Sequence, residues 1–103
     1  MRIALVRIDR PGMAAVRARL QPAHMEYQKP FLGMIKFGGG FVEDGTDTSG
    51  EVDIEDVIGN LLVFEAPDRE TVANFHANDP YTLADLFETA IIKAFWQRVP
   101  DPN

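Results

Sequence analysis

Residues 57–88 read VIGNLLVFEAPDRETVANFHANDPYTLADLFE, and the patterns that decide the fold follow one another in this stretch. Val57 to Phe64 is an almost continuous apolar run, which is typical of a strand that is covered on both faces. Asp68 then has the position of a helix N-cap, and a helical stripe follows it. Asp79 and Pro80 form a second helix-start signal, because Asp caps free backbone N–H groups and proline suits the first helical position. The stretch therefore predicts a strand, a helix, a capped turn and the start of another strand.

The segments on either side of this stretch continue the alternation of strands and helices. The other predicted strands are residues 2–8, 33–42 and 86–96. Between the first two strands, an amphipathic stripe predicts a helix that begins near Met13, kinks or restarts at Pro22 and ends before Pro30. The predicted order is β-α-β-β-α-β. In the ferredoxin-like α+β fold this order gives a four-stranded antiparallel sheet with two helices on one face.

The predicted strands carry apolar side chains on both faces, although the two helices cover only one face of such a sheet. In the first strand, Ile3 and Leu5 alternate with Ala4 and Val6. Monomeric proteins rarely expose a large apolar patch, so a second copy of the same sheet is the simplest cover for the other face. We therefore expect a homodimer that packs sheet against sheet.

Composition excludes several classes of protein. The chain has 103 residues, 46% apolar and 25% charged, which predicts one globular domain over residues 1–103. No apolar run approaches the roughly 20 residues that span a bilayer, and the first residues lack a signal-peptide core, so we expect a cytoplasmic protein with no membrane partner. The net charge of −6 argues against a nucleic-acid partner. There is no cysteine and no EF-hand spacing in the acidic segment 43–56, so we predict neither a metal nor a cofactor.

His24 and Asp79 each carry a side chain that is suited to acid–base chemistry. Histidine accepts and returns a proton near neutral pH, and a carboxylate at its second ring nitrogen fixes the tautomer and stabilises the imidazolium. Two plainer interpretations stay open, because Asp79 alone is explained as a helix cap and a lone histidine on a helix is more often structural than catalytic. His76 belongs to the stripe of the second helix and is interpreted as packing. Ser49 is the only serine and lies in the acidic segment, which disfavours covalent catalysis.

Several segments resemble one family. Residues 19–27, RLQPAHMEY, resemble the segment that carries the hallmark histidine of YciI-like proteins. The other segments that resemble the family are the glycine-containing strand at 33–40, APDRE at 66–70, NDPY at 78–81 and LFE at 86–88. The resemblance covers nearly the whole chain in the same order. It implies a dimeric α+β barrel, with a pocket in each subunit that holds His24 and Asp79 as a pair.

The chain departs from the family pattern at two places. The family usually has a proline after its strand-two glycine, where this chain has Gly39 or Gly40, and this difference affects the rim of the predicted pocket. It usually has a glycine before the Leu-Phe-Glu run, where this chain has Asp85, and we expect that carboxylate to add negative charge near the pocket. The candidate substrate-binding residues are Tyr27, Gly39, Pro80 and Tyr81, although the two tyrosines are equally explained as core.

Two classes of function stay open from the sequence. The first is a small cofactor-free enzyme that uses His24 and Asp79 for proton abstraction, isomerisation or elimination on a small, cyclic or anionic substrate. For one branch of the family, the resemblance implies lyase or dehydrohalogenase chemistry on hydroxylated aromatic rings. The second class is a non-catalytic domain, either small-molecule-binding or accessory, on the same barrel. A histidine that faces solvent beside a closed pocket would favour the second class.

Overall fold

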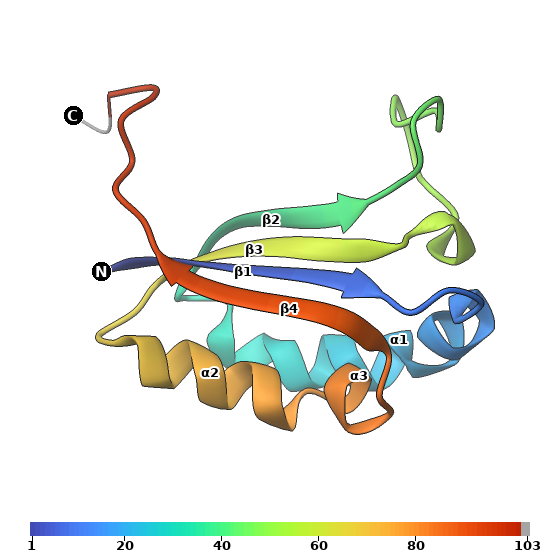
Figure 1. The fold of residues 1–103 in the computed structure, drawn as a ribbon, viewed down its shortest axis with the longest axis horizontal. Coiled ribbons are helices and arrows are strands. Elements are labelled where there is room, and N and C mark those ends of the chain that lie inside the picture. The colour runs from blue at the N-terminus through green and yellow to red at the C-terminus, as the bar shows by residue number, and fades with distance from the viewer. Residues whose placement is uncertain (102–103) are drawn as a thin grey trace.

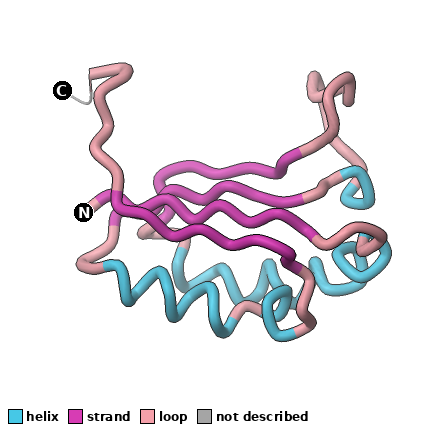
Figure 2. The backbone as a smooth tube through the Cα atoms, viewed as in Figure 1, coloured by secondary structure: helices cyan, strands magenta, loops and turns pink. Residues whose placement is uncertain are grey.

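A computed structural model describes residues 1–101, which form a four-stranded antiparallel sheet with the helices on one face (Figures 1 and 2). The strands are β1 (Arg2–Asp9), β2 (Ile35–Phe41), β3 (Gly59–Glu65) and β4 (Phe87–Ala94). The helices are α1 (Ala14–Gln28), α2 (Arg69–Asn78) and the one-turn α3 (Pro80–Leu83), with 3₁₀ turns at Lys29–Phe31 and Ile54–Asp56. The sheet order is β2-β3-β1-β4. The α+β fold class and the β-α-β-β-α-β order are confirmed, with α3 as a short addition before β4.

The central strand β1 directs alternate side chains into the core. Ile3 and Leu5 are fully buried on the side of the helices, and each such side chain contributes about 1.5–3 kcal/mol through removal from water. Phe64 of β3 pairs with Ile3, and its ring lies 5.2 Å from the ring of Phe75 on α2. Arg7 occupies the next position on this face and is also fully buried. The strand pattern that builds the core therefore brings a guanidinium group into it.

Helix α1 runs without interruption through Pro22, so the chain does not start a second helix at this residue. Proline in a helix interior removes one backbone hydrogen bond and crowds the preceding turn. Pro22 is exposed, whereas Arg17 and His24 on the same helix are buried, and such tertiary packing supplies most of a helix's stability. The helix ends at Gln28, before Pro30, as predicted. Among residues 1–101, no helix is both long and apolar enough to cross a membrane.

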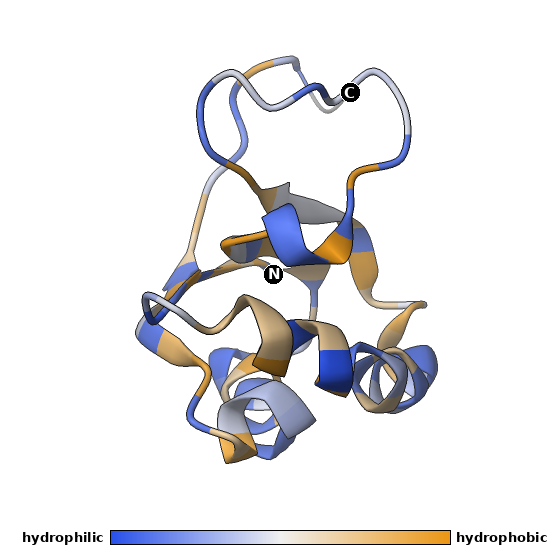
Figure 3. Ribbon diagram, turned by 90° about the vertical axis from the view of Figure 1, so that its right-hand side faces the viewer, coloured by the Kyte–Doolittle hydropathy of each residue, from blue (hydrophilic) through white to orange (hydrophobic). Residues whose placement is uncertain are grey.

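The sheet face away from the helices is uncovered in the single chain (Figure 1). Ile8, Phe37 and Ile91 are exposed, and Phe37 retains 54% of its accessible surface. The loop after β2 and the segment after β4 both extend on this side of the sheet, opposite the helices (Figure 3). The apolar second face anticipated from the strand patterns is therefore present. The homodimer expected to cover it stays a prediction.

Candidate active site

His24 and Asp79 meet in the interior although 55 positions separate them in the chain. Nδ1 of His24 lies 2.9 Å from both carboxylate oxygens of Asp79. Asp79 is fully buried and His24 is 5% exposed. With its N–H donating to the carboxylate, Nδ1 is occupied, and Nε2 is the ring nitrogen that is left for another partner. The structure brings the two candidate residues together, and their role in catalysis stays a prediction.

Asp79 also caps the short helix α3. Its Oδ1 accepts a hydrogen bond from the backbone N–H of Tyr81 at 3.0 Å, and Pro80 occupies the first helical position. A carboxylate has two oxygens with about four acceptor sites, so capping and binding to His24 are compatible. The cap therefore fixes the position of the carboxylate that contacts the imidazole.

Arg7 is a third partner of Asp79, and it was not among the site residues predicted from the sequence. Its Nη1 donates to Oδ2 of Asp79 at 3.0 Å, and its Nε donates to Oδ1 of Asn60 at 3.0 Å. The ring of Phe87 lies 4.4 Å from the guanidinium carbon, a distance typical of a cation–π contact. The sequence pattern that could have indicated Arg7 is the alternation Ile3, Leu5, Arg7, which places it on the buried face of the strand. A charged side chain on such a face is rare unless it is paired.

The charges of this network favour an ionised Asp79. Burial alone would raise the pKa of Asp79, but the hydrogen bond from His24 and the charge of Arg7 outweigh burial and hold that pKa below its ordinary value. Burial lowers the pKa of Arg7, and the carboxylate of Asp79 opposes this effect. The network therefore contains one permanent cation and one carboxylate that share a buried space with the imidazole of His24.

His76 has a polar role in addition to the packing that the helical stripe predicted. It is half-buried, and its Nδ1 lies 3.4 Å from Nη1 of Arg7 and 3.3 Å from Oγ1 of Thr82. Burial and the charge of Arg7 lower the pKa of His76, so the neutral imidazole is favoured. The interpretation of His76 as packing alone was therefore incomplete, because the residue also faces the guanidinium of Arg7.

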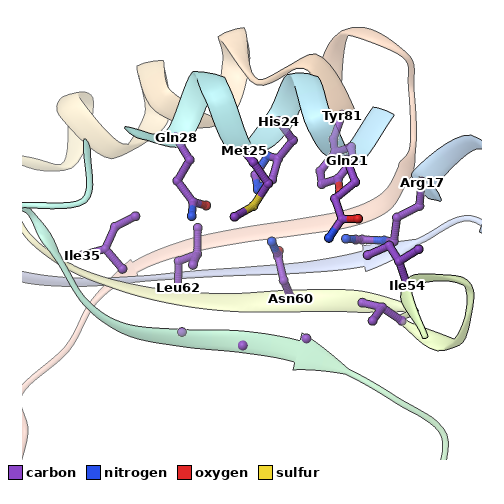
Figure 4. Close-up of a pocket in the computed structure, with 14 residues that line it drawn as sticks. Arg17, Gln21, His24, Met25, Gln28, Ile35, Ile54, Asn60, Leu62 and Tyr81 are labelled. Atoms are coloured by element: carbon purple, nitrogen blue, oxygen red, sulfur yellow. The ribbon is translucent and has the colours of Figure 1, made fainter. Parts of the chain in front are cut away.

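A cavity of about 300 Å³ lies between α1 and the half of the sheet that contains β2 and β3 (Figure 4). Its lining residues are Arg17, Gln21, His24, Met25, Gln28, Ile35, Gly38, Gly39, Gly40, Ile54, Val57, Asn60, Leu62 and Tyr81. This volume is at the lower end of the range of about 300–1,000 Å³ that is usual for ligand sites. His24 lines the cavity while Asp79 lies behind it, so the imidazole is positioned between the buried carboxylate and any bound molecule.

The glycines of β2 keep one side of the cavity free of side chains. A Cβ atom at Gly38 would lie 2.5 Å from Cδ2 of Leu62, and one at Gly40 would lie 2.9 Å from Cγ1 of Val57. Both distances are shorter than real Cβ contacts. A side chain at Gly38 or Gly40 would therefore displace residues that line the cavity, whereas a Cβ atom at Gly39 would meet nothing within 4 Å.

Tyr81 and Arg17 continue the wall of the cavity beside His24. The ring of Tyr81 stacks on the imidazole with a centroid distance of 4.3 Å and an interplanar angle of 13°. The guanidinium carbon of Arg17 lies 4.7 Å from the ring of Tyr81. Nε and Nη2 of Arg17 each donate to the carboxylate of Asp9 at 2.7 Å. Burial raises the pKa of Tyr81, so its hydroxyl stays protonated at neutral pH.

The four candidate substrate-binding residues divide into two groups. Gly39 and Tyr81 line the cavity. The hydroxyl of Tyr27 donates to the backbone carbonyl of Phe75 at 2.9 Å, and the ring packs into the core. Pro80 starts α3. Tyr27 and Pro80 are not among the residues that line the cavity, because the ring of Tyr27 packs against Phe31 and Phe75 and Pro80 occupies the first turn of α3.

The two departures from the family pattern also have clear positions. Gly40 lies at the cavity, as expected for a residue of its rim. The side chain of Asp85 is 81% exposed and pairs with Arg10 at 3.0 Å, outside the cavity. The expectation that Asp85 adds negative charge near the pocket is therefore wrong. Asp85 has a φ of 56°, the left-handed region that favours glycine but also accommodates Asp, so the backbone conformation explains this position.

Comparison with known proteins identifies similar chains. A model of the family described as the YCII-related domain matches residues 1–96. The solved structure of 5-chloro-2-hydroxyhydroquinone dehydrochlorinase (TftG) from Burkholderia phenoliruptrix AC1100, in complex with 2,5-dihydroxybenzoquinone, is 35% identical with a TM-score of 0.85 and covers 94% of this chain and 95% of that chain. A protein from Agrobacterium tumefaciens is 19% identical with a TM-score of 0.49, over 98% of this chain and 95% of that chain. No curated protein matches the chain.

Proposed function

The chain belongs to the YCII-related domain family, and from this membership and the geometry of the cavity we propose that it is a small-molecule enzyme whose acid–base residue is His24. The observation that carries the proposal is the position of the imidazole. Its Nδ1 lies 2.9 Å from the buried carboxylate of Asp79, while the same ring lines a cavity large enough for a single-ring molecule.

The arrangement supports proton transfer at Nε2 of His24. With Nδ1–H donating to Asp79, Nε2 carries a lone pair that accepts a proton from a bound molecule. Asp79 stabilises the resulting imidazolium, and Arg7 keeps Asp79 ionised. Among the described residues that line the cavity there is no serine, threonine, cysteine or lysine, so general acid–base chemistry is favoured over covalent catalysis. Such proton transfer contributes about 10²–10⁴-fold to a rate.

The substrate class follows from the likeness to the dehydrochlorinase, which extends over nearly all of both chains. We propose a single carbon ring that carries several hydroxyl or keto oxygens, and an elimination or isomerisation as the reaction. In the elimination from a chlorinated trihydroxybenzene, His24 takes a proton from one hydroxyl and returns it to the chlorine-bearing ring carbon, which gives a keto tautomer. Loss of a second hydroxyl proton to His24 then forms the second carbonyl group, while chloride departs from that carbon with its bonding pair. Loss of hydrogen chloride from a chlorinated trihydroxybenzene gives a hydroxyquinone, because chloride removes two electrons and no external oxidant is required.

The assembly and the location belong to the same proposal. The exposed apolar side chains Phe37 and Ile91 on the open sheet face support a homodimer that packs through this face. A cytoplasmic location is consistent with the proposed use of a diffusible small substrate, and it rests on the sequence composition alone.

The proposal is tested by chloride release from 5-chloro-2-hydroxyhydroquinone under anaerobic conditions, with quinone formation followed by absorbance. We expect turnover by the wild type and by Asp85→Asn, whose substituted side chain lies outside the cavity, and a loss of about 100-fold or more in His24→Gln. Equal rates in the wild type and His24→Gln would refute the proposed role. Ligand binding with no turnover of any chlorinated or unchlorinated hydroxylated ring would instead support the non-catalytic binding domain.

A further inference from the structure

The charge of the cavity wall differs from that of the whole protein. The chain has sixteen acidic and ten basic residues, yet the described residues that line the cavity include no aspartate or glutamate. Arg17 is the permanent cation among them, and His24 is the titratable group. Because Arg17 is paired with Asp9, the wall carries little net charge, and its guanidinium and amide groups offer hydrogen-bond donors to the oxygens of a ligand.

Asn60 presents hydrogen-bond donors to this cavity. Its Oδ1 accepts from Nε of Arg7 at 3.0 Å, and this bond assigns the orientation of the amide. The two N–H groups of Nδ2 are then the part of the side chain that remains for the cavity. Figure 4 shows the side chain of Asn60 rising from β3 toward α1. Because Arg7 is fully buried and also binds Asp79, one guanidinium orients both Asn60 and the carboxylate behind His24.

Arg17 is held in an equally fixed orientation. The bidentate pair with Asp9 uses Nε and Nη2, so Nη1 is the guanidinium nitrogen that Asp9 does not bind. Arg17 is only 3% exposed and contacts the face of Tyr81, whose other neighbour in the stack is His24. Arg17 and His24 are seven residues apart on α1, which is two helical turns or about 10.5 Å. Donors from α1 and from β3 therefore line the same cavity as the imidazole.

We propose that Arg17 and Asn60 are the substrate-recognition residues of this site, and that they bind two oxygens of an ionised hydroxyquinone or hydroxylated aromatic ring beside Nε2 of His24. The inference rests on the proposed function, because it specifies the substrate of the same cavity. Preoriented donors cost little ordering on binding, and hydrogen bonds to an ionised oxygen are stronger than those to a neutral one. The wall thus selects the anionic form of the ring over the neutral form.

The test is a binding titration that does not depend on turnover. The probe is 2,5-dihydroxybenzoquinone, which is ionised at neutral pH, and hydroquinone is the uncharged ring of similar size. We expect Asn60→Asp and Arg17→Met to weaken binding of the ionised probe by about 10- to 100-fold and that of hydroquinone by far less. Arg10→Met, which removes an exposed arginine outside the cavity, leaves both affinities unchanged. If Arg17→Met is unfolded by circular dichroism, Arg17→Lys replaces it, with an expected loss of about tenfold because lysine cannot reproduce the bidentate pair with Asp9.

The outcomes separate this inference from the acid–base proposal. Wild-type binding that Asn60→Asp and the folded Arg17 variant leave unchanged would overturn the inference, and so would equal affinity of the wild type for the two probes. Selective loss of anion binding in both variants supports it even if no chlorinated ring is turned over, in which case the acid–base proposal alone fails. Absence of any binding to the wild type would overturn both.

Discussion

Replacement of Asp79 by Asn removes one charge from a buried ion pair while the side chain keeps its shape. Nη1 of Arg7 lies 3.0 Å from Oδ2 of Asp79, and both side chains are 0% exposed. Nη2 of Arg7 has no hydrogen-bond partner among the described atoms, so the variant leaves a buried cation with still less compensation. Removal of one partner from a buried pair costs about 3–5 kcal/mol. Because domains unfold with about 5–15 kcal/mol, this change removes a large share of the total stability.

The chain contains a matched control for this experiment. Nη2 of Arg10 also lies 3.0 Å from Oδ1 of Asp85, but these side chains are 45% and 81% exposed. An exposed pair contributes about 0–1 kcal/mol, and Asn tolerates the left-handed backbone conformation at position 85. Asp79→Asn and Asp85→Asn therefore remove the same charge at the same distance from an arginine, and they differ in burial and in the further bonds of Asp79 to His24 and Tyr81.

Urea denaturation followed by circular dichroism measures the two free energies of unfolding. We expect Asp79→Asn to lose about 3–5 kcal/mol and Asp85→Asn less than about 1 kcal/mol. For a domain of this size, the first loss lowers the melting temperature by roughly 12–40 °C. Arg7→Met combined with Asp79→Asn recovers part of the loss, because neither charge is then left alone. Equal losses in Asp79→Asn and Asp85→Asn would refute the assignment of a buried, strongly coupled pair.

Three further predictions concern stability in acid, the glycines of β2 and the open face of the sheet. The pKa of Asp79 is held below its ordinary value, so the ionised carboxylate stabilises the fold fully above the unfolded-state pKa of about 3.9, and this stabilisation decreases as the pH falls through the folded-state pKa. The urea midpoint of Asp79→Asn should therefore depend less on pH in acid than that of the wild type. Equal pH dependence of the two midpoints would contradict this prediction. Gly38→Ala should lower the free energy of unfolding in urea by about 1–3 kcal/mol, since its Cβ would lie 2.8 Å from the carbonyl oxygen of Leu61, whereas Gly39→Ala is expected to be nearly neutral. Equal urea midpoints for the two variants would show that β2 is not tightly packed at Gly38. Light scattering should give twice the 11.5 kDa chain mass for the wild type and a folded monomer for Ile91→Lys on the open face, and a wild-type monomer at micromolar concentration would exclude the dimer.

The local features of the fold were the ones that the sequence predicted well. Asp68 caps α2, since its Oδ1 accepts from the backbone N–H of Thr71 at 2.8 Å. Asp79 caps α3, and α1 ends before Pro30, both as predicted. These features depend on residues within one helical turn, so the short-range rules of capping and proline geometry are sufficient. Pro22 was the exception, because the buried contacts elsewhere on α1 outweigh its local preference.

The candidate site was predicted only in part because its members come from distant segments. His24 and Asp79 were found through a resemblance to a family, since no local pattern joins α1 to α3. Arg7 and Asn60 were missed, and their bonds to the site cross 72 and 53 positions, respectively. A charged residue in register with buried strand positions was the available signal for Arg7. For Arg17 the signal was the seven-residue spacing to His24, which places both side chains on one face of a helix.

The central claim, that His24 transfers protons to and from a bound ring, is tested most directly by solvent exchange. 2-Hydroxyhydroquinone, which has no leaving group, is incubated anaerobically in D₂O with the protein, and the loss of its ring C–H signals is followed by ¹H NMR. We predict exchange above the uncatalysed background with the wild type and with Asp85→Asn, and a reduction of about 100-fold or more with His24→Gln, which remains able to bind the ring. Exchange that His24→Gln catalyses as fast as the wild type, or no exchange above background with the wild type, would contradict the claim.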